Sequence, residues 1–213
     1  MASDLSIQCN CGSFRGIARG VSRKVGIRVV CYCDDCQHFA HYLGARDTTL
    51  DSHGGTDIFQ MSPAAFNITQ GLDKLACLRL TPKGPLRWYT NCCKTPIGNT
   101  PPTNQLPFVG LIHSCINSDG QSLAHVLGSV SARVMVQYAK GDITTLENTS
   151  DGFSLSHMAR IAWKLLIWRV QGAHKHSPFF DVATGTPIAS PLLLSERTRS
   201  NDDSANDNSF SEK

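Results

Sequence analysis

The sequence predicts a mainly β fold of small antiparallel sheets around metal sites, followed by one amphipathic helix. Three observations predict it. Short apolar runs rich in β-branched residues alternate with turn residues through much of the chain, which is typical of strands. Most of the nine cysteines fall into three tight clusters, and one late stretch repeats its apolar residues at helical spacing.

The β-rich part of the chain offers a series of short strands. They are expected within 5–19 and at 25–30, 58–61, 66–69, 75–80, 86–89 and 132–139. Residues 81–85, Thr-Pro-Lys-Gly-Pro, form a turn, so the strands on either side of it are expected to pair as a hairpin. Asn99 and Thr100 lead into two prolines and predict a loop.

Two stretches have helical character. Residues 37–44 are expected to make two helical turns ended by Gly44. Residues 153–170 form the longer helix, with Asp151 or Ser154 as its cap. Its apolar positions are 155, 158, 159, 161, 162, 165, 166 and 168.

The late helix also carries a basic face. Arg160, Lys164 and Arg169 lie on it, and no acidic residue occurs between 152 and 180. Basic amphipathic helices can lie on membranes. We expect instead that the apolar side packs on the β domain of the same protein. The packed residues are expected to include Leu165, Leu166 and Trp168.

These elements divide the chain into three parts. Residues 5–138 are expected to form a zinc-binding β domain. Residues 139–195 form a C-terminal extension whose helix covers about 153–171. Residues 196–213 are polar and rich in Asp, Asn and Ser, which predicts disorder.

Charge and hydropathy exclude several classes of protein. A formal net charge of +3 gives no strongly basic face, so we expect no nucleic-acid partner. The N-terminus has no basic segment followed by an apolar run, and no apolar run is long enough for a membrane span. We therefore expect a cytoplasmic protein whose thiols stay reduced.

The segment 31–36, Cys-Tyr-Cys-Asp-Asp-Cys, holds three thiols. Clustered cysteines without a secretory signal indicate a metal site rather than a disulfide framework. Three protein ligands and an open position are the pattern of a catalytic zinc, whereas four closed ligands mark a structural one. His38, His41 or a cysteine from elsewhere in the chain could close the fourth position.

Two further pairs of cysteines flank this cluster. Cys9 and Cys11 precede it, and Cys92 and Cys93 follow the hairpin. Adjacent side chains of a strand point to opposite faces, so both sulfurs of the later pair could reach one ion only at a turn. We expect Cys93 as a ligand and keep Cys92 as a second candidate.

The remaining candidates are isolated residues. Cys77 and Cys115 lie in apolar runs and are expected in the core rather than at a metal. The glycine-rich loop 51–57 carries His53 and Asp57, which either face a site or are solvated surface groups.

The order of the cysteine motifs resembles one known family, that of glutathione-dependent formaldehyde-activating enzyme and centromere protein V. The resemblance covers roughly residues 5–116 and rests on Cys9-x-Cys11-Gly12, Cys31-x-Cys33-x-x-Cys36 and Cys93-x-Thr95-Pro96. It implies a mostly β fold, a structural zinc and a second zinc at the active site. It assigns Cys9, Cys11 and Cys93 to the structural ion and Cys31, Cys33 and Cys36 to the catalytic one.

The chain departs from the family's pattern in the late motif. The family has Cys-x-x-Cys there, but position 90 is Thr90 and the extra cysteine is Cys92. The structural site is therefore expected to use Cys92, to hold zinc weakly, or to hold none. The helix at 153–170 also lies outside the family's minimal domain.

The resemblance implies a reaction. The family's enzymes join or split a hydroxymethyl group on the sulfur of glutathione, which is carbon–sulfur lyase chemistry. We expect one or two zinc ions per chain and a small thiol partner, such as a glutathione adduct of an aldehyde. The catalytic candidates are Cys31, Cys33, Cys36 and His53, with Asp34, Asp35 and His38 as further candidate bases.

Two alternatives to a lyase stay open. Three thiolates leave a zinc site at net charge −1, which favours binding a thiol over activating water. A non-catalytic zinc module that binds a thiol or a protein partner keeps every ligand and drops the chemistry. A chromatin or cytoskeletal role ranks last, because the tail 196–213 is acidic on balance.

Overall fold

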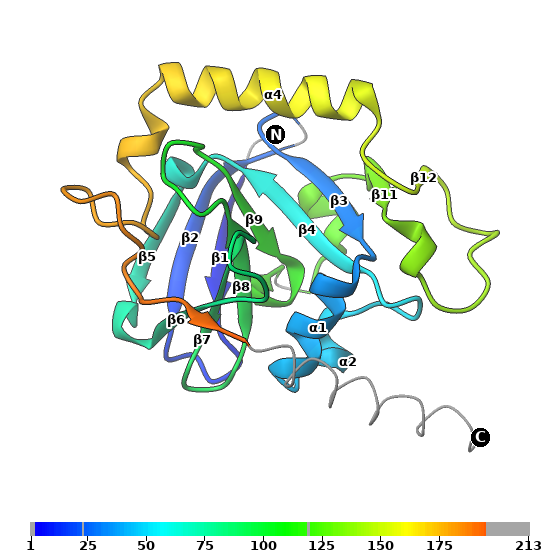
Figure 1. Ribbon diagram of the computed structural model, residues 1–213, viewed down its shortest axis with the longest axis horizontal. Coiled ribbons are helices and arrows are strands. Elements are labelled where there is room, and N and C mark those ends of the chain that lie inside the picture. Colours follow the sequence, from blue (N-terminus) through cyan, green and yellow to red (C-terminus); the bar gives the residue numbers. More distant parts are fainter. Residues whose placement is uncertain (1–2, 23, 119, 195–213) are drawn as a thin grey trace.

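The computed structural model describes residues 3–22, 24–118 and 120–194. It confirms the mainly β fold and contains two sheets (Figure 1). The smaller sheet has the strand order β10 (Ile116–Asn117), β1 (Ser3–Gln8), β2 (Arg15–Val21) and β5 (Phe66–Gln70). All its pairings are antiparallel.

The larger sheet has nine strands and is antiparallel from β3 to β6. Its order is β12 (Thr149–Ser150), β11 (Ala132–Val134), β3 (Ile27–Cys31), β4 (Thr56–Met61), β9 (Val109–Ile112), β8 (Pro96–Thr100), β7 (Leu86–Thr90), β6 (Leu75–Arg79) and β13 (Leu192–Leu193). The short strands β11, β12 and β13 extend its two edges with parallel pairings.

Helices occupy the connections between the strands. The α-helices are α1 (Asp34–Tyr42), α2 (Arg46–Thr49), α3 (Leu123–Leu127) and α4 (Leu155–Val170). The single turns of 3-10 helix are η1 (Pro63–Ala65), η2 (Leu72–Lys74), η3 (His113–Cys115), η4 (Val136–Tyr138) and η5 (Ala173–Lys175). Within the described ranges, no helix is both long and apolar enough to cross a membrane.

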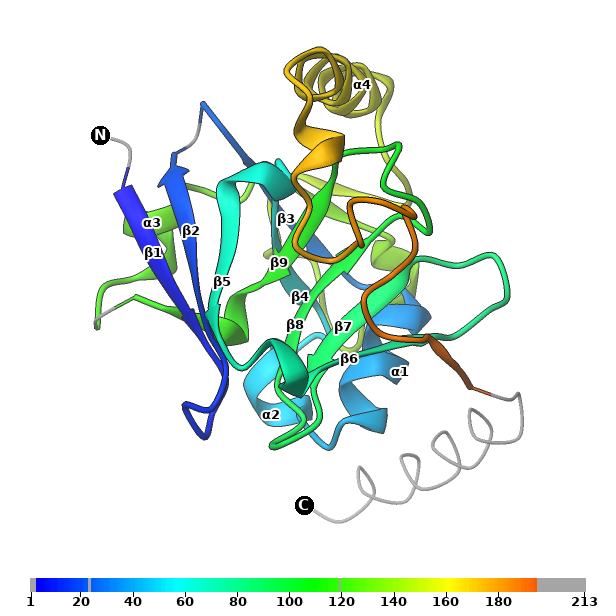
Figure 2. The same ribbon diagram turned by 90° about the vertical axis from the view of Figure 1, so that its left-hand side faces the viewer.

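The main core lies between the two sheets, which face each other in Figure 2. Alternate residues of β1 and β2 point into it, as the period-two pattern of a strand requires. Phe179, from the segment after α4, lies between the sheets. Its ring centroid is 5.6 Å from that of Phe66 and 5.0 Å from that of Trp88. The C-terminal segment therefore completes the core that the β-strands begin.

The other face of the large sheet is covered by two helices. Phe39 of α1 packs edge-on against Tyr89, with 6.4 Å between the ring centroids. Ile161 of α4 packs with Ile27 of β3 and Ile58 of β4, in the same cluster as Cys36. Both helices therefore lie on the face of the sheet that carries the three clustered thiols.

Most expected strands are confirmed, and one is corrected. Asn99 and Thr100 lead into a loop at Pro101, as expected, but they end a strand that was not expected, β8, in the middle of the large sheet. The expected strand 132–139 is only three residues long, because Met135 has a positive φ of 59° and η4 follows. The tail 196–213 lies outside the described residues.

The late helix forms as expected, and Ser154 is its cap, accepting a hydrogen bond from the His157 amide. Its packing is only partly as expected. Trp168 is buried and Leu165 is half-buried, but the expectation for Leu166 is wrong, because 54% of its surface is exposed. The apolar residues of α4 lie on two opposite sides of the helix. Helical periodicity alone does not tell which of these sides packs on the protein.

Candidate metal centres

The first group of thiols begins in a tight loop after β1. The Gly12 amide donates to the Cys9 carbonyl at 2.9 Å, and the Cys9 amide donates to the Phe14 carbonyl at 3.1 Å. Gly12 has a φ of 73°, in the left-handed region that glycine adopts without strain. The Phe14 amide also points at the Cys9 sulfur, 3.3 Å away. The loop therefore folds back around its own sulfur atoms.

The other half of this group lies in the turn between β7 and β8. The Lys94 amide donates to the Thr90 carbonyl at 2.9 Å, and Lys94 has a φ of 56°. This is the turn that Cys92 and Cys93 need in order to point to one side. The Asn10 amide donates to the Thr95 hydroxyl at 2.9 Å and joins this turn to the loop after β1.

The two halves bring four sulfur atoms together. The Sγ atom of Cys92 lies 3.9 Å from that of Cys9, 3.4 Å from that of Cys11 and 3.8 Å from that of Cys93. All four Sγ atoms lie within 4.8 Å of one another. Zinc–sulfur bonds of about 2.3 Å in a tetrahedron separate the sulfurs by roughly 3.8 Å. The geometry therefore fits one four-coordinate ion, which we call the four-thiol site.

Threonine hydroxyls support the four-thiol site. Thr90 lies at the position where the resembled family has a cysteine. Its hydroxyl is 3.5 Å from the Cys93 sulfur, and the hydroxyl of Thr95 is 3.2 Å from the same sulfur. Burial raises the pKa of Cys93, but the hydrogen bonds from Thr95 and Thr90 outweigh it and lower the pKa to about 5. The hydroxyl and amide of Ser13 likewise lower the pKa of Cys11. These groups favour the thiolate form that a metal requires.

The second group of thiols lies where β3 meets α1. Cys31 ends the strand, and Cys33 is the residue that precedes the first turn of α1. The Cys36 amide donates to the Cys33 carbonyl at 2.9 Å, which turns the Cys36 side chain back toward the strand. The three sulfurs lie within 4.8 Å of one another, with 3.3 Å between those of Cys31 and Cys33. We call this group the three-thiol site.

The three-thiol site has no fourth protein ligand in the part of the chain that the structure describes. No further Cys, His, Asp or Glu ligand atom there joins the group within 4.8 Å. Cys36 is buried, whereas Cys31 and Cys33 are partly exposed. A metal held by these sulfurs would therefore keep a coordination position for an outside ligand.

Arg87 lies beside this site, and sequence analysis missed it. It is 97% buried, with 3% of its surface exposed, and it reaches the site from β7. Its Nη1 lies 3.8 Å from the Cys36 sulfur, and its Nη2 lies 3.6 Å from an oxygen of Asp35. The guanidinium also lies over the ring of Phe39, 5.5 Å from its centroid. A cation is thus fixed beside one ligand sulfur.

The three thiols respond differently to this environment. Hydrogen bonds from Cys31 and Cys33, together with the charge of Arg87, hold the pKa of Cys36 well below its ordinary value despite burial. The bond to Cys31 lowers the pKa of Cys33, but the bond to Cys36 and burial raise it to about 12. The pKa of Cys31 is also raised, first by its hydrogen bond to Cys33. Without a metal, the negative charge is concentrated on Cys36.

The other sequence candidates lie outside both groups. The Nδ1 of His53 is 2.9 Å from the Lys140 carbonyl, and that of His38 is 2.9 Å from the Asp34 carbonyl. Asp57 is held by Arg28, whose Nε lies 3.0 and 3.1 Å from the two carboxylate oxygens. His41 belongs to neither thiol group. Cys77 and Cys115 are buried in the core, as expected.

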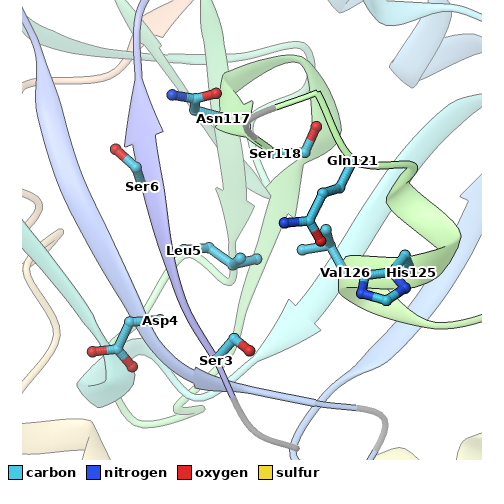
Figure 3. Close-up of a pocket in the computed structure, with 9 residues that line it drawn as sticks. All are labelled: Ser3, Asp4, Leu5, Ser6, Asn117, Ser118, Gln121, His125 and Val126. Atoms are coloured by element: carbon cyan, nitrogen blue, oxygen red, sulfur yellow. The ribbon is translucent and has the colours of Figure 1, made fainter.

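A separate cavity lies between β1, β10 and α3 (Figure 3). Its volume is about 390 Å³, and serine, amide and His125 side chains line much of it. It has no cysteine lining, so it is not part of either thiol site.

Comparisons with known proteins give a family but no activity. A family model described as a family of unknown function, DUF6151, matches residues 1–190. No curated protein matches significantly. A crystal structure of a Rhodobacter sphaeroides protein is similar at 13% identity with a TM-score of 0.39, over 59% of this chain and 96% of that one.

Proposed function

Because this chain belongs to DUF6151, a family of unknown function, we propose a role from the geometry of its thiol sites alone. The protein is a zinc protein whose three-thiol site takes a small thiol as a further ligand. The observation that carries the proposal is the grouping of Cys31, Cys33 and Cys36 without a fourth ligand among the described residues.

The two sites have different parts in this proposal. The four-thiol site is closed, since four sulfurs complete the coordination of a zinc ion, and its part is structural. Cysteine sulfur is a soft ligand that selects zinc or other thiophilic metals over magnesium or calcium. A zinc ion bound at the three-thiol site would supply a Lewis acid with one position open to a sulfur ligand.

Arg87 makes a thiol ligand electrostatically acceptable. Three thiolates and a divalent cation carry a net charge of −1, and a fourth thiolate makes it −2. The guanidinium places a positive charge 3.8 Å from the Cys36 sulfur, and Asp35 pairs with its other terminal nitrogen at 3.6 Å. A hydrogen bond to a ligand sulfur also weakens that sulfur as a donor, so the metal stays electrophilic toward an incoming ligand.

The resemblance of the cysteine motifs supports carbon–sulfur lyase chemistry on the bound thiol. In an S-hydroxymethyl adduct, a base takes the hydroxyl proton, the carbon–sulfur bond breaks, and formaldehyde leaves while the electron pair stays on sulfur. Asp35 is a candidate base because it lies in the segment between Cys33 and Cys36, with its carboxylate 3.6 Å from the Arg87 guanidinium. His53 stays a candidate, with its Nδ1 engaged by the Lys140 carbonyl.

Cobalt substitution tests the open position. The visible spectrum of cobalt-loaded protein should change when glutathione is added, and Cys33→Ser should abolish that change. Cys11→Ser, a ligand of the other site, serves as the matched control and should retain it. A spectrum that ignores glutathione between pH 6 and about pH 9 would show a closed site and contradict the proposal.

A second measurement separates a lyase from a thiol-binding module. Wild-type zinc protein mixed with the glutathione–formaldehyde adduct should release or consume formaldehyde faster than buffer does. If glutathione changes the spectrum but the protein does not accelerate formaldehyde release or consumption, the proposed thiol-binding site stands and the proposed lyase activity is contradicted.

A further inference from the structure

Helix α4 has two apolar sides, and only one of them packs on the protein. On the inner side, Trp168 is buried, and Lys164 donates through Nζ to the carbonyls of Lys24 and Val25 at 2.7 and 3.0 Å. The opposite side carries large apolar residues at the i, i+3 and i+4 spacing of one helix face. These residues, here called the outer stripe, are Leu155, Met158, Trp163, Leu166, Ile167 and Val170.

The outer stripe is strongly exposed. The exposed fraction is 89% for Leu155, 79% for Val170 and 63% for Trp163. Figure 1 shows α4 along the outer edge of the molecule, and Figure 2 shows it nearly end-on at the top. Single exposed apolar residues are ordinary, but a stripe along a whole helix indicates a surface that another body covers.

Positive charge surrounds the outer stripe. Arg160 and Arg169 are exposed on α4, and Lys175 is exposed just beyond its end. No acidic residue occurs between 152 and 180. The surface therefore combines a continuous apolar band with uncompensated cations, which complements an anionic and apolar partner.

Arg160 also lines a small pocket beside the helix. The pocket has a volume of about 210 Å³, and Arg28, Ser129 and Ser131 contribute to its wall. Arg28 is engaged by Asp57. In the described part of the chain, no carboxylate forms an ion pair with Arg160. Two serine residues and an arginine are suitable partners for phosphate oxygens.

We propose that α4 docks this protein on an anionic phospholipid surface. The outer stripe enters the boundary between headgroups and acyl chains, and Arg160 and Arg169 bind lipid phosphates. The 16 residues of α4 span about 24 Å at 1.5 Å per residue, which is less than the hydrocarbon thickness of about 30 Å. The helix therefore lies flat in the interface. This inference does not depend on the metal sites.

A second copy of the chain is a poorer occupant of the same surface. Two α4 helices packed stripe to stripe would bring Arg160 and Arg169 of both copies together. No carboxylate between 152 and 180 is available to pair with them. Lipid phosphates remove this repulsion, whereas a second copy doubles it.

Vesicle partitioning tests the proposal with the full-length protein. It should bind vesicles of phosphatidylcholine with phosphatidylglycerol and bind pure phosphatidylcholine weakly. Leu166→Glu should lower the partition coefficient at least tenfold. The matched control is Leu72→Glu, because Leu72 is 55% exposed but lies outside α4, on η2. Equal losses for the two variants, or no binding by the wild type, would overturn the proposal.

Two further readouts locate the contact. Trp163 is the exposed tryptophan, since Trp88 and Trp168 are buried. Its emission should shift to the blue on anionic vesicles and not on inorganic phosphate, and Trp163→Phe should lose the shift while still binding.

Arg160→Gln and Arg169→Gln should each weaken binding about fivefold. Dimers that Leu166→Glu dissociates, in protein that ignores vesicles, would instead assign the stripe to a second copy.

Discussion

At the scale of single residues, the grouping of the candidate ligands could be predicted from the sequence, and the arginine beside them could not. Candidate metal ligands supplied by one short segment can be recognised from their spacing, as with Cys31, Cys33 and Cys36. Arg87 comes from a strand 51 residues away from Cys36. Only the sheet order β4–β9–β8–β7 brings it near α1, and no local pattern contains that information.

Arg87→Gln tests the role of this buried cation. Removing one partner of a buried charged pair costs about 3 kcal/mol of the free energy of unfolding. The loss should fall on the three-thiol site, which should release its metal to a chelator earlier than wild type while the four-thiol site keeps its own. Arg87→Lys retains the charge but not the fork of donors and should recover part of the effect.

The control is Arg169→Gln, which removes an exposed arginine of α4. If Arg87→Gln and Arg169→Gln release metal to the chelator at the same rate, Arg87 contributes to packing but does not stabilise the metal site. The readout is the time course of metal release followed with a coloured chelator.

At the same scale, the geometry brings Cys92 into the four-thiol site, whereas position 90 carries a threonine. From the sequence alone, it was open whether Cys92 belongs to the four-thiol site, because the turn at 90–94 could not be predicted. The structure brings the Cys92 sulfur within 3.4 to 3.9 Å of those of Cys9, Cys11 and Cys93. A positive φ at Lys94 is not apparent from the residue type.

At the scale of elements, the β7–β8 turn and the loop after β1 depend on each other. Cys92→Ser removes one ligand of a shared ion, whose binding energy is also folding energy. It should lower the melting temperature by roughly 10 °C or more. Cys115→Ser should cost only a few degrees, because a serine hydroxyl can still donate to the Ile112 carbonyl, 3.1 Å from the sulfur.

A second substitution makes this prediction specific. Thr90→Cys in the Cys92→Ser background restores a Cys-x-x-Cys pair and should recover much of the melting temperature. Chelator should bring wild type and Cys92→Ser to the same value. A difference that survives chelation would mean that the turn, and not a metal, accounts for the loss. Scanning calorimetry with and without chelator supplies all these values.

The elements that sequence reasoning missed have physical causes. Strand β8 contains Pro96, Gly98 and Asn99, three residues that disfavour strands, and it is held by neighbours on both sides. Helix α4 was predicted with its cap, but periodicity cannot say which apolar side meets the body. That choice depends on where β3 and its preceding loop lie.

At the scale of the whole molecule, the nine cysteines fall into two chemical classes. Seven belong to the two thiol sites, and Cys77 and Cys115 are core residues. Burial raises the pKa of both core thiols to about 12, so at pH 8 they are protonated in the folded state and react slowly. With metal bound, the folded protein should therefore expose few reactive thiols.

Thiol counting checks this division. A colorimetric thiol reagent at pH 8 should find few groups in metal-loaded protein, up to seven after chelation, and nine in denaturant. Elemental analysis should return two equivalents of zinc. Nine reactive thiols in the folded, chelated protein would show that Cys77 and Cys115 are not protected by burial. Less than half an equivalent of metal per chain would contradict the prediction that the thiol sites bind metal.

The wide separation of the ligands of the four-thiol site has a consequence for synthesis of the protein. Cys11 and Cys92 are 81 residues apart in the chain. A ribosome adding 5–20 residues per second needs roughly 4–16 s to make the second half of the site. During that interval the first two cysteines are a bare pair on a nascent chain, open to oxidation or to a competing metal. If the four-thiol site binds zinc as proposed, its loading must wait for translation of the β7–β8 turn, and the reducing capacity and free-zinc level around the nascent chain set how many chains mature with both sites filled.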